Sequence, residues 1–401
     1  MSPHHRLDEL RALLAGTDLS LATRRLMDLC DDYPLLHDLR PAAMQVRAEY
    51  NMGRELGASE LSGGSAEQVK AQAQALVEAI AARSAALTEQ ALARASETVY
   101  WSQGVVKRFH SGGHRFELGP MDLELRTGEI TGVVGENGNG KTTLLRQVAG
   151  LLNHDEGELR WPAAPADPFE RRGTIAWIPQ RSARWYGTLL QNLRFTASIH
   201  GINGAANEDR VQYTLHRLGL TRFANLTWNE LSSGYKLRFE LARMVVWRPR
   251  ILVLDEPIAN LDLQAQQLFL QDLKHLAASA RDPVSIILSS QQLHEIEAIA
   301  DRIVFLKNGK PMYSGSTAGF DNDRSSNVYE LKGALDRQRL IAALGAANVL
   351  ALDDTGIVLR LTTPRALGPR ELMRALNSAD IELSYFRDIS TSTRKLFHQD
   401  T

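Results

Sequence analysis

The segment GENGNGKTT, Gly135 to Thr143, constrains the fold of this chain more than any other stretch of its sequence. It fits the pattern G-x-x-x-x-G-K-[ST], follows the strand-like run EITGVVG and opens the helix-like run TTLLRQVAGLL. Glycines let the backbone curl so that its amides point at phosphate oxygens, and the helix start adds the positive end of a dipole. The sequence therefore predicts a phosphate-binding loop, rather than an ordinary glycine-rich turn, formed by Gly135, Asn137, Gly138, Gly140, Lys141, Thr142 and Thr143.

A second motif, ILVLDEP, reads as a hydrophobic strand that ends in two carboxylates, Asp255 and Glu256. We expect Lys141 to reach the β- and γ-phosphates of a nucleotide, and Thr142 and Asp255 to hold Mg²⁺. Glu256 is placed to polarise an attacking water as a general base. An acidic loop after a core strand is the plain alternative, and the upstream phosphate loop argues against it.

The texture of the sequence predicts three domains. From Thr98 short strand-like runs alternate with helical runs, which indicates α/β layering around a buried sheet. Residues 1–96 space their apolar residues by three and four, which predicts an all-α accessory region, either a plain bundle or a docking or regulatory arm. The runs in 326–401 follow the order βαββαβ, typical of a small ferredoxin-like α+β domain. The central domain is expected to span 97–320.

Composition narrows the setting in which this chain works. Among 401 residues, 46 basic and 47 acidic side chains give a formal charge of -1, so no global pull toward nucleic acid or anionic lipid is expected. The single cysteine, Cys30, suits a reducing compartment. The start MSPHHRLDELRALL lacks the layout of a signal peptide, and no apolar run approaches the ~18 residues of a membrane span. We expect a cytoplasmic chain that reaches a membrane only through partners.

Further motifs follow in a fixed order, and together they resemble one family. Gln180 lies in WIPQ, and LSSGYKLR (Leu231–Arg238) precedes ILVLDEP. NLD, Asn260 to Asp262, comes after that strand, and SSQ, Ser289 to Gln291, follows. The ordered set, over about Val99 to Ser316, resembles the ATP-binding subunit of ABC transporters, with its Q-loop, signature motif, D-loop and switch.

The resemblance implies an α/β P-loop NTPase cassette that binds ATP and Mg²⁺ and hydrolyses ATP. It implies a second cassette, identical or merely related, that meets the first head to tail. Each ATP would then be held between Lys141 of one subunit and the signature motif of the other. Gln180 would act in catalysis and as a Mg²⁺ ligand. The residues implied at the nucleotide from the signature motif and D-loop are Ser232, Ser233, Gly234 and Asp262.

Two assignments within the resemblance have competitors. The aromatic that stacks on adenine would be Phe109, with Phe116 as a rival, and ordinary core packing explains either equally well. LSGG, Leu61 to Gly64, looks closer to the family's LSGGQ than LSSG does, but it precedes the phosphate loop and no DEP strand follows it. We interpret it as a loop before a helix that Ser65 and Gln68 cap.

One departure from the family concerns hydrolysis, because Gln291 stands where the switch histidine is usual. Glutamine can donate a hydrogen bond but cannot carry a positive charge. Losing one transition-state donor costs on the order of 10²–10³ in rate, and glutamine keeps part of that interaction. We expect slow but nonzero hydrolysis with Glu256 as the base, or else pairing with a different cassette that leaves one site degenerate.

The segment between Gln180 and Leu231 corresponds to the family's coupling surface for membrane subunits. Its GTLLQNLRFTASIHG stretch resembles the export type, as does the tail FRDISTSTRKLF. We therefore expect a power subunit for export of a drug, lipid or polysaccharide through separately encoded transmembrane permease subunits.

The alternatives are a non-transport ABC ATPase on ribosomes or DNA, and an ATP-dependent clamp or regulator. Relatives that act on DNA place a long coiled coil between the phosphate loop and the DEP strand. Here Lys141 and Asp255 lie only 114 residues apart (255 − 141). No direct nucleic-acid partner is expected.

Overall fold

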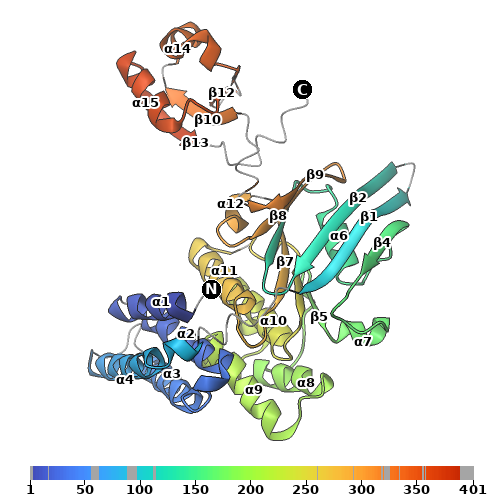
Figure 1. Ribbon diagram of the computed structural model, residues 1–401, viewed down its shortest axis with the longest axis vertical. Coiled ribbons are helices and arrows are strands. Elements are labelled where there is room, and N and C mark those ends of the chain that lie inside the picture. Colours follow the sequence, from blue (N-terminus) through green and yellow to red (C-terminus); the bar gives the residue numbers. More distant parts are fainter. Residues whose placement is uncertain are drawn as a thin grey trace. The chain divides into compact units, whose positions relative to one another are not determined.

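The computed structural model describes residues 3–16, 18–55, 63–87, 97–111, 114–259, 261–291, 293–317, 319, 326–333, 335–354, 356 and 358–388. The chain divides into two compact units. Figure 1 labels the helices and strands along the chain. The first unit comprises Met1–Thr131 and Thr142–Ser289, and the second comprises Gly132–Lys141 and Ser290–Thr401.

The first unit begins with a helical bundle. Its elements are α1 (Pro3–Ala15), α2 (Leu19–Asp32), the 3₁₀ turn η1 (Pro34–Leu36), α3 (Arg40–Glu55) and α4 (Gly63–Ala81). Asp18 caps α2 by accepting a hydrogen bond from the Leu21 amide at 2.9 Å. Leu10, Leu26 and Leu29 are almost fully buried in the shared core.

Helix α4 corrects one expectation, because Gly63, Gly64 and Ser65 are helical rather than part of a loop. The alanine-rich run that follows buries Val77 and Ile80 in the core of the bundle. Most helical stability in proteins comes from such packing, which here extends the helix over two glycines of low propensity. Leu61 and Ser62 lie outside the described residues.

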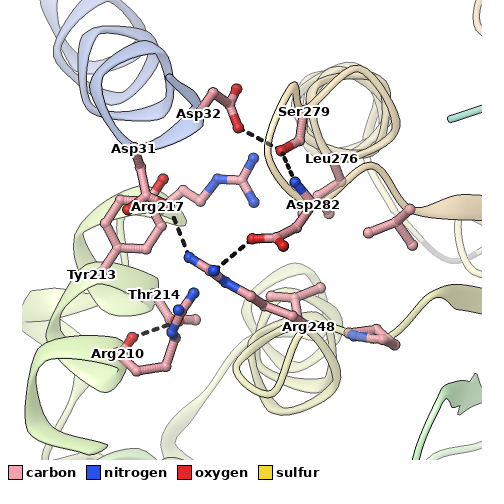
Figure 2. A pocket seen from close by; sticks show the side chains of 13 residues that line it. Asp31, Asp32, Arg210, Tyr213, Thr214, Arg217, Arg248, Leu276, Ser279 and Asp282 are labelled. Atoms are coloured by element: carbon pink, nitrogen blue, oxygen red, sulfur yellow. Dashed lines mark hydrogen bonds and ion pairs between the residues drawn. The ribbon is translucent and has the colours of Figure 1, made fainter. Parts of the chain in front are cut away.

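The bundle packs against helices of the same unit that come much later in the chain. Tyr213 of α9 (Gly204–Arg217) belongs to the apolar core of the bundle. Asp28 of α2 pairs with Arg217 of α9 at 2.5 Å. Figure 2 shows the charged side of this contact, where Asp32 faces Ser279 and bonds to it at 2.5 Å. The accessory region is therefore docked on the cassette through both apolar and ionic contacts.

Two sheets follow the bundle in the sequence. An antiparallel sheet has the order β2-β1-β4, with β1 Thr98–Ser111, β2 His114–Arg126 and β4 Glu156–Arg160. The central sheet has the order β5-β6-β7-β3-β8-β9. Its strands are β3 (Ile130–Val134), β5 (Ile175–Ile178), β6 (Ile251–Leu254), β7 (Ser285–Ser290), β8 (Arg302–Lys307) and β9 (Lys310–Ser316). Strands β3 and β7 contribute residues to both units, and both are buried along their whole length. The expected α/β layering is confirmed.

Helices fill the connections of the first unit. They are α6 (Lys141–Val148), which starts in the second unit, α7 (Pro168–Arg172), α8 (Leu189–Ile199), α9, η2 (Thr221–Phe223), η3 (Trp228–Glu230), α10 (Ser233–Val245) and α11 (Leu263–Ala277). Thr188 and Gln191 form a capping box at the start of α8. Across the described part of the chain, no helix is both long and apolar enough to cross a membrane.

The second unit contains strands β8 and β9, the short helix α12 (Leu293–Ile296) and a small α+β body. That body follows the order β10 (Ser326–Gly333), α14 (Arg337–Leu344), η4 (Ala346–Asn348), β11 (Ala351–Asp354), β12 (Leu359–Pro364), α15 (Pro369–Ser378) and β13 (Leu383–Asp388). Its sheet has the order β11-β12-β10-β13, and each pairing is antiparallel. Tyr329, Leu340 and Leu372 are fully buried in its core. Most of the tail FRDISTSTRKLF lies outside the described residues.

Candidate nucleotide site

The predicted phosphate loop connects β3 to α6. Gly138 and Gly140 have φ values of +83° and +95°, a region that favours glycine. A Cβ on Gly135 would come within 2.6 Å of the Leu306 carbonyl oxygen, so only glycine fits there. The Lys141 ammonium is folded over the loop and donates to the Gly135 carbonyl at 2.7 Å. The backbone of this loop is therefore curled around the Lys141 ammonium.

Some of the other loop residues are exposed to solvent, and one of them anchors the loop. Asn137 and Gly138 are exposed, Thr142 is exposed at the first turn of α6, and Thr143 is half-buried. The neighbouring Asn139, which the sequence reading passed over, accepts a hydrogen bond from the Asn308 amide at 2.9 Å. The buried Asn139 side chain therefore anchors the loop to the backbone at Asn308, while Asn137 and Gly138 stay exposed.

The carboxylate Asp255 lies between two hydroxyl groups. Thr142 Oγ1 donates to one of its oxygens at 2.8 Å, and Ser289 Oγ donates to the other at 2.8 Å. Asp255 is 4% exposed and follows strand β6 directly. Thr142 and Asp255, which are 113 residues apart in sequence, thus lie within hydrogen-bond distance of each other.

Glu256 is held by both its backbone and its side chain. Its φ of +46° is left-handed, a conformation that costs a non-glycine residue about 1–3 kcal/mol and is found most often at functional sites. The Glu256 amide donates to Ser289 Oγ at 2.8 Å, and Gln180 Nε2 donates to Glu256 Oε2 at 2.9 Å. Gln180, which follows β5, therefore orients the carboxylate, and Ser289 of β7 holds the backbone amide.

Ser289 is a candidate site residue that the sequence did not single out, although it stands in the SSQ motif. It is fully buried, and its hydroxyl accepts from Glu256 N while donating to Asp255. Ser289 lies near the end of β7, which pairs in parallel with β6, so it comes close to the residues that follow β6. That placement is the signal that could have identified it. One serine thus fixes both acidic residues of the DEP motif.

The residues present fit a Mg²⁺ ion. One hydroxyl and one carboxylate meet at the start of α6, and Mg²⁺ prefers such hard oxygen donors, usually completed by waters and substrate phosphates. Within the described ranges, no group of three or more His, Cys, Asp or Glu side chains forms a separate metal site. Thr142 and Asp255 could hold the ion together with the phosphates.

The signature residues lie at the start of α10. Ser232 is the N-cap residue, and Ser232 and Ser233 are both exposed. A Cβ on Gly234 would meet Ala265 at 3.5 Å, so this position packs closely on the next helix. Asp262 caps that helix, α11, by accepting from the Ala265 amide at 2.9 Å. Asn260 lies outside the described residues.

The last two predicted residues are at the surface. Gln291 directly follows β7 and is exposed. Phe109 is 38% exposed and pairs across the strands with Phe116, with ring centroids 6.4 Å apart. The Lys107 ammonium lies 5.7 Å from the Phe109 ring centre. Phe109 is therefore partly exposed, with Phe116 and Lys107 beside its ring.

Comparisons with known proteins converge on this site. A family model described as "ABC transporter" matches residues 118–259. The chain is 27% identical over 218 residues to the ABC transporter ATP-binding protein NatA of Bacillus subtilis, which spans 52% of this chain and 85% of that protein. It is 34% identical over 207 residues to the energy-coupling factor transporter ATP-binding protein EcfA1 of Thermotoga maritima, which spans 51% of this chain and 78% of that protein.

Solved structures show the same fold. The structure of cbiO1 from Clostridium perfringens, described as part of the ABC transporter complex cbiONQ, aligns with a TM-score of 0.52 and 22% identity. The alignment covers 57% of this chain and 92% of cbiO1. An ATP-binding subunit of another ABC transporter aligns with a TM-score of 0.50 and 24% identity, over 56% of this chain and 92% of that subunit.

Proposed function

The chain belongs to the ATP-binding subunits of ABC transporters and is an ATPase of that family, and from that premise we propose that it powers a transporter whose membrane-spanning subunits are separate chains. The observation that carries the proposal is the run of hydrogen bonds from Thr142 through Asp255 and Ser289 to Glu256 and Gln180. This run joins the predicted magnesium ligands to the predicted base.

In the proposed mechanism, the chain's own residues position water and phosphate. The Glu256 carboxylate takes a proton from the attacking water. Gln180 donates a hydrogen bond to that carboxylate, and Ser289 holds the Glu256 backbone amide. Thr142 and Asp255 would hold Mg²⁺, which would supply positive charge to offset the negative charge of the phosphates. Lys141 turns from the loop carbonyls toward the β- and γ-phosphates when nucleotide enters.

A second cassette completes each site in this proposal. The exposed Ser232 and Ser233 at the start of α10 form a second anion site that would face the γ-phosphate held by the other subunit. Asp262 and Gln291 would lie at the same seam, and Phe109 would stack on the adenine.

The membrane subunits would dock beside α8. Phe195 and Ile199, which are 65% and 63% exposed, lie one helical turn apart on α8, and Tyr186 just before the helix is 84% exposed. Large apolar side chains grouped in this way suit a protein interface. Through that interface the chain would work as a peripheral protein on the inner face of the cell membrane.

The names of several relatives bear on the direction of transport. The names of several relatives describe import of sulfate or thiosulfate, Fe(3+) ions and phosphonates, which does not favour export. We keep export of a drug, lipid or polysaccharide as the proposal from the sequence. Transport assays in inside-out and right-side-out vesicles would separate the two directions.

We further propose the domain limits 1–96, 97–320 and 326–401, with the last a ferredoxin-like appendage. Its antiparallel strand order β11-β12-β10-β13 and its βαββαβ element order support that assignment.

The second candidate function is an ATP-dependent clamp or regulator that barely hydrolyses ATP. Gln291 favours this second function, because a glutamine side chain lacks the positive charge that a histidine can carry.

The test is ATP turnover by the purified chain and its Glu256→Gln variant. We expect measurable turnover that falls about 100-fold or more in the variant, the usual range for losing a general base, with ATP binding retained. Glu158→Gln, on the exposed strand β4, is the matched control. Equal turnover in Glu256→Gln and wild type would exclude Glu256 as the base, and absent turnover in wild type would favour the clamp.

A further inference from the structure

The N-terminal bundle contacts one face of α11. The contacts are made by three side chains spaced by three and four residues: Asp272 and His275 of α11, and Ser279 just beyond its end. Residues three and four apart lie on the same side of a helix. Arg25 of α2 lies 3.4 Å from Asp272. Glu9 of α1 lies 3.1 Å from His275. The bundle therefore holds α11 at several points along one face.

Asp272 is the point where α2, α10 and α11 meet. Its carboxylate is 3% exposed. Arg24 and Arg25 of α2 lie 3.5 Å and 3.4 Å from one of its oxygens. Arg238 of α10 lies 3.3 Å from the other oxygen. Burial raises the pKa of Asp272, but the three guanidinium groups outweigh it and hold that pKa below its usual value. One buried, charged carboxylate therefore joins the bundle to two helices of the cassette.

The bundle also holds the chain at the far end of α10. Arg248, shortly after that helix, lies 3.1 Å from Asp31 of α2 and 2.6 Å from Asp282 (Figure 2). Its φ is +59°, a strained conformation for a non-glycine residue that persists only where the surrounding structure fixes it. The ion pair with Asp31 supplies part of that fixation, so α10 is tied to the bundle at its end as well as at Arg238.

The starts of α10 and α11 pack on each other. A Cβ on Gly234 would lie 3.5 Å from the Ala265 Cβ. The second contact between the two helices, Arg238 with Asp272, lies seven residues further along α11 (272 − 265), a distance of about 10 Å. Two helices that touch at two separated points cannot pivot about either one. The contact at Asp272 therefore fixes the angle at which the two helix starts meet.

We propose that Asp272 is a positioning residue of the ATP site, through which the N-terminal bundle sets the relative positions of the signature motif and the D-loop. Helix α2 holds α11 against α10, and the two helix starts present Ser233 and Asp262. The effect on ATP hydrolysis rests on the proposed function, in which these residues complete the site of a second cassette. The local ordering of the two helix starts does not depend on it.

Two variants weaken this junction. Asp272→Asn keeps the shape of the side chain and removes the charge that three guanidinium groups share. Arg24→Gln is milder, because Asp272 keeps its two other partners, and this variant carries the test if Asp272→Asn does not fold. Asp38→Asn and Arg83→Gln are the matched controls, since that pair is exposed in the same bundle at 2.7 Å and exposed pairs contribute little.

Hydrogen exchange of the nucleotide-free full chain measures the effect at two amides. The Lys236 amide donates to the Ser232 carbonyl at 2.9 Å, which closes the first turn of α10. The Gln266 amide donates to the Asp262 carbonyl at 2.9 Å, which closes the first turn of α11. Their rates are compared with those of the buried strand β6, which report global unfolding.

Relative to β6, both amides should exchange at least about tenfold faster in Asp272→Asn and a few-fold faster in Arg24→Gln. The controls should match wild type. Arg24 Nη1 has no hydrogen-bond partner in the part of the chain that the structure describes, so its pairing with Asp272 is Coulombic. Arg24→Lys keeps that charge and should restore the wild-type rates. If both amides keep their wild-type rates in Asp272→Asn and Arg24→Gln, the bundle only stabilises the fold and the proposal is wrong.

ATP turnover supplies the second measurement. At saturating ATP it should fall at least about tenfold in Asp272→Asn, while the ATP concentration for half-maximal rate changes less than about twofold because the phosphate loop is untouched. Full wild-type turnover in a variant with faster exchange would overturn the role in hydrolysis. Absent turnover in wild type would instead contradict the proposed function, and the exchange rates would still decide whether Asp272 positions the two helices.

Discussion

Replacing Asp28 with asparagine is expected to loosen the docking of the N-terminal bundle. The Asp28 carboxylate is 1% exposed and lies 2.5 Å from Arg217 Nε and 3.1 Å from Arg25 Nη1. The Tyr213 hydroxyl donates to it at 3.3 Å. Asparagine keeps the shape and removes the charge, so two buried guanidinium groups lose their shared counter-charge.

The size of the effect follows from burial. Burial raises the pKa of Asp28, but Arg217 and Arg25 outweigh it and hold that pKa well below its usual range. Removing one partner of a buried ion pair costs about 3–5 kcal/mol. Arg25 keeps Asp272 at 3.4 Å, so we expect the loss to stay within that range. At an m-value of about 3 kcal/mol per molar urea, the unfolding midpoint falls by roughly 1 M or more.

Urea denaturation at pH 7, followed by circular dichroism, measures this change. Asp38→Asn in the same bundle is the control, because Asp38 pairs with Arg83 at 2.7 Å while both side chains are exposed. Exposed pairs contribute little, so the control should leave the midpoint unchanged. The reasoning fails if Asp28→Asn and Asp38→Asn unfold at the same urea concentration.

Three further outcomes are expected. Ser289→Ala should lower ATP turnover at least about tenfold, because Asp255 loses a donor and the Glu256 amide loses an acceptor. The control is Ser285→Ala, which is buried on the same strand. Equal turnover in the two variants would contradict the role of Ser289. Gln291→His should raise steady-state phosphate release, since an imidazolium can carry the charge that glutamine lacks, and a slower variant would argue against that reading. The pKa of His216 is lowered to about 4 in the folded chain, so between about pH 6.5 and pH 4 only the unfolded chain gains a proton and stability falls as pH falls. In His216→Asn the urea midpoint should change less with pH over that window than in wild type. An unchanged pH dependence of the midpoint would point to another titrating group.

The local chemistry of the site was readable from spacing. The loop from Gly135 to Thr143 needs a strand before it and a helix after it, and the structure has both. Asp255 comes immediately after a buried strand, so its approach to Thr142 followed from the shared edge of a parallel sheet.

The tertiary contacts were not readable in the same way. Arg25 meets Asp272 across 247 residues of sequence, and Asp28 meets Arg217 across 189. Charged residues on an amphipathic helix usually face solvent, so periodicity alone gave no reason to bury those of α2. The central role of Ser289 also depends on two strands lying side by side, which no single motif reports.

The ionic docking of the bundle has a practical consequence for dissecting this chain. A fragment trimmed to start near Glu97 would lose Asp28, Glu9 and the helices that cover Tyr213. Arg217 would then lack its counter-charge and His275 its hydrogen-bond partner Glu9, beside an apolar surface newly exposed to water. Such a fragment would tend to aggregate on purification. If adding residues 1–96 as a separate chain restored its solubility, that would measure directly how far the two pieces form one folding unit.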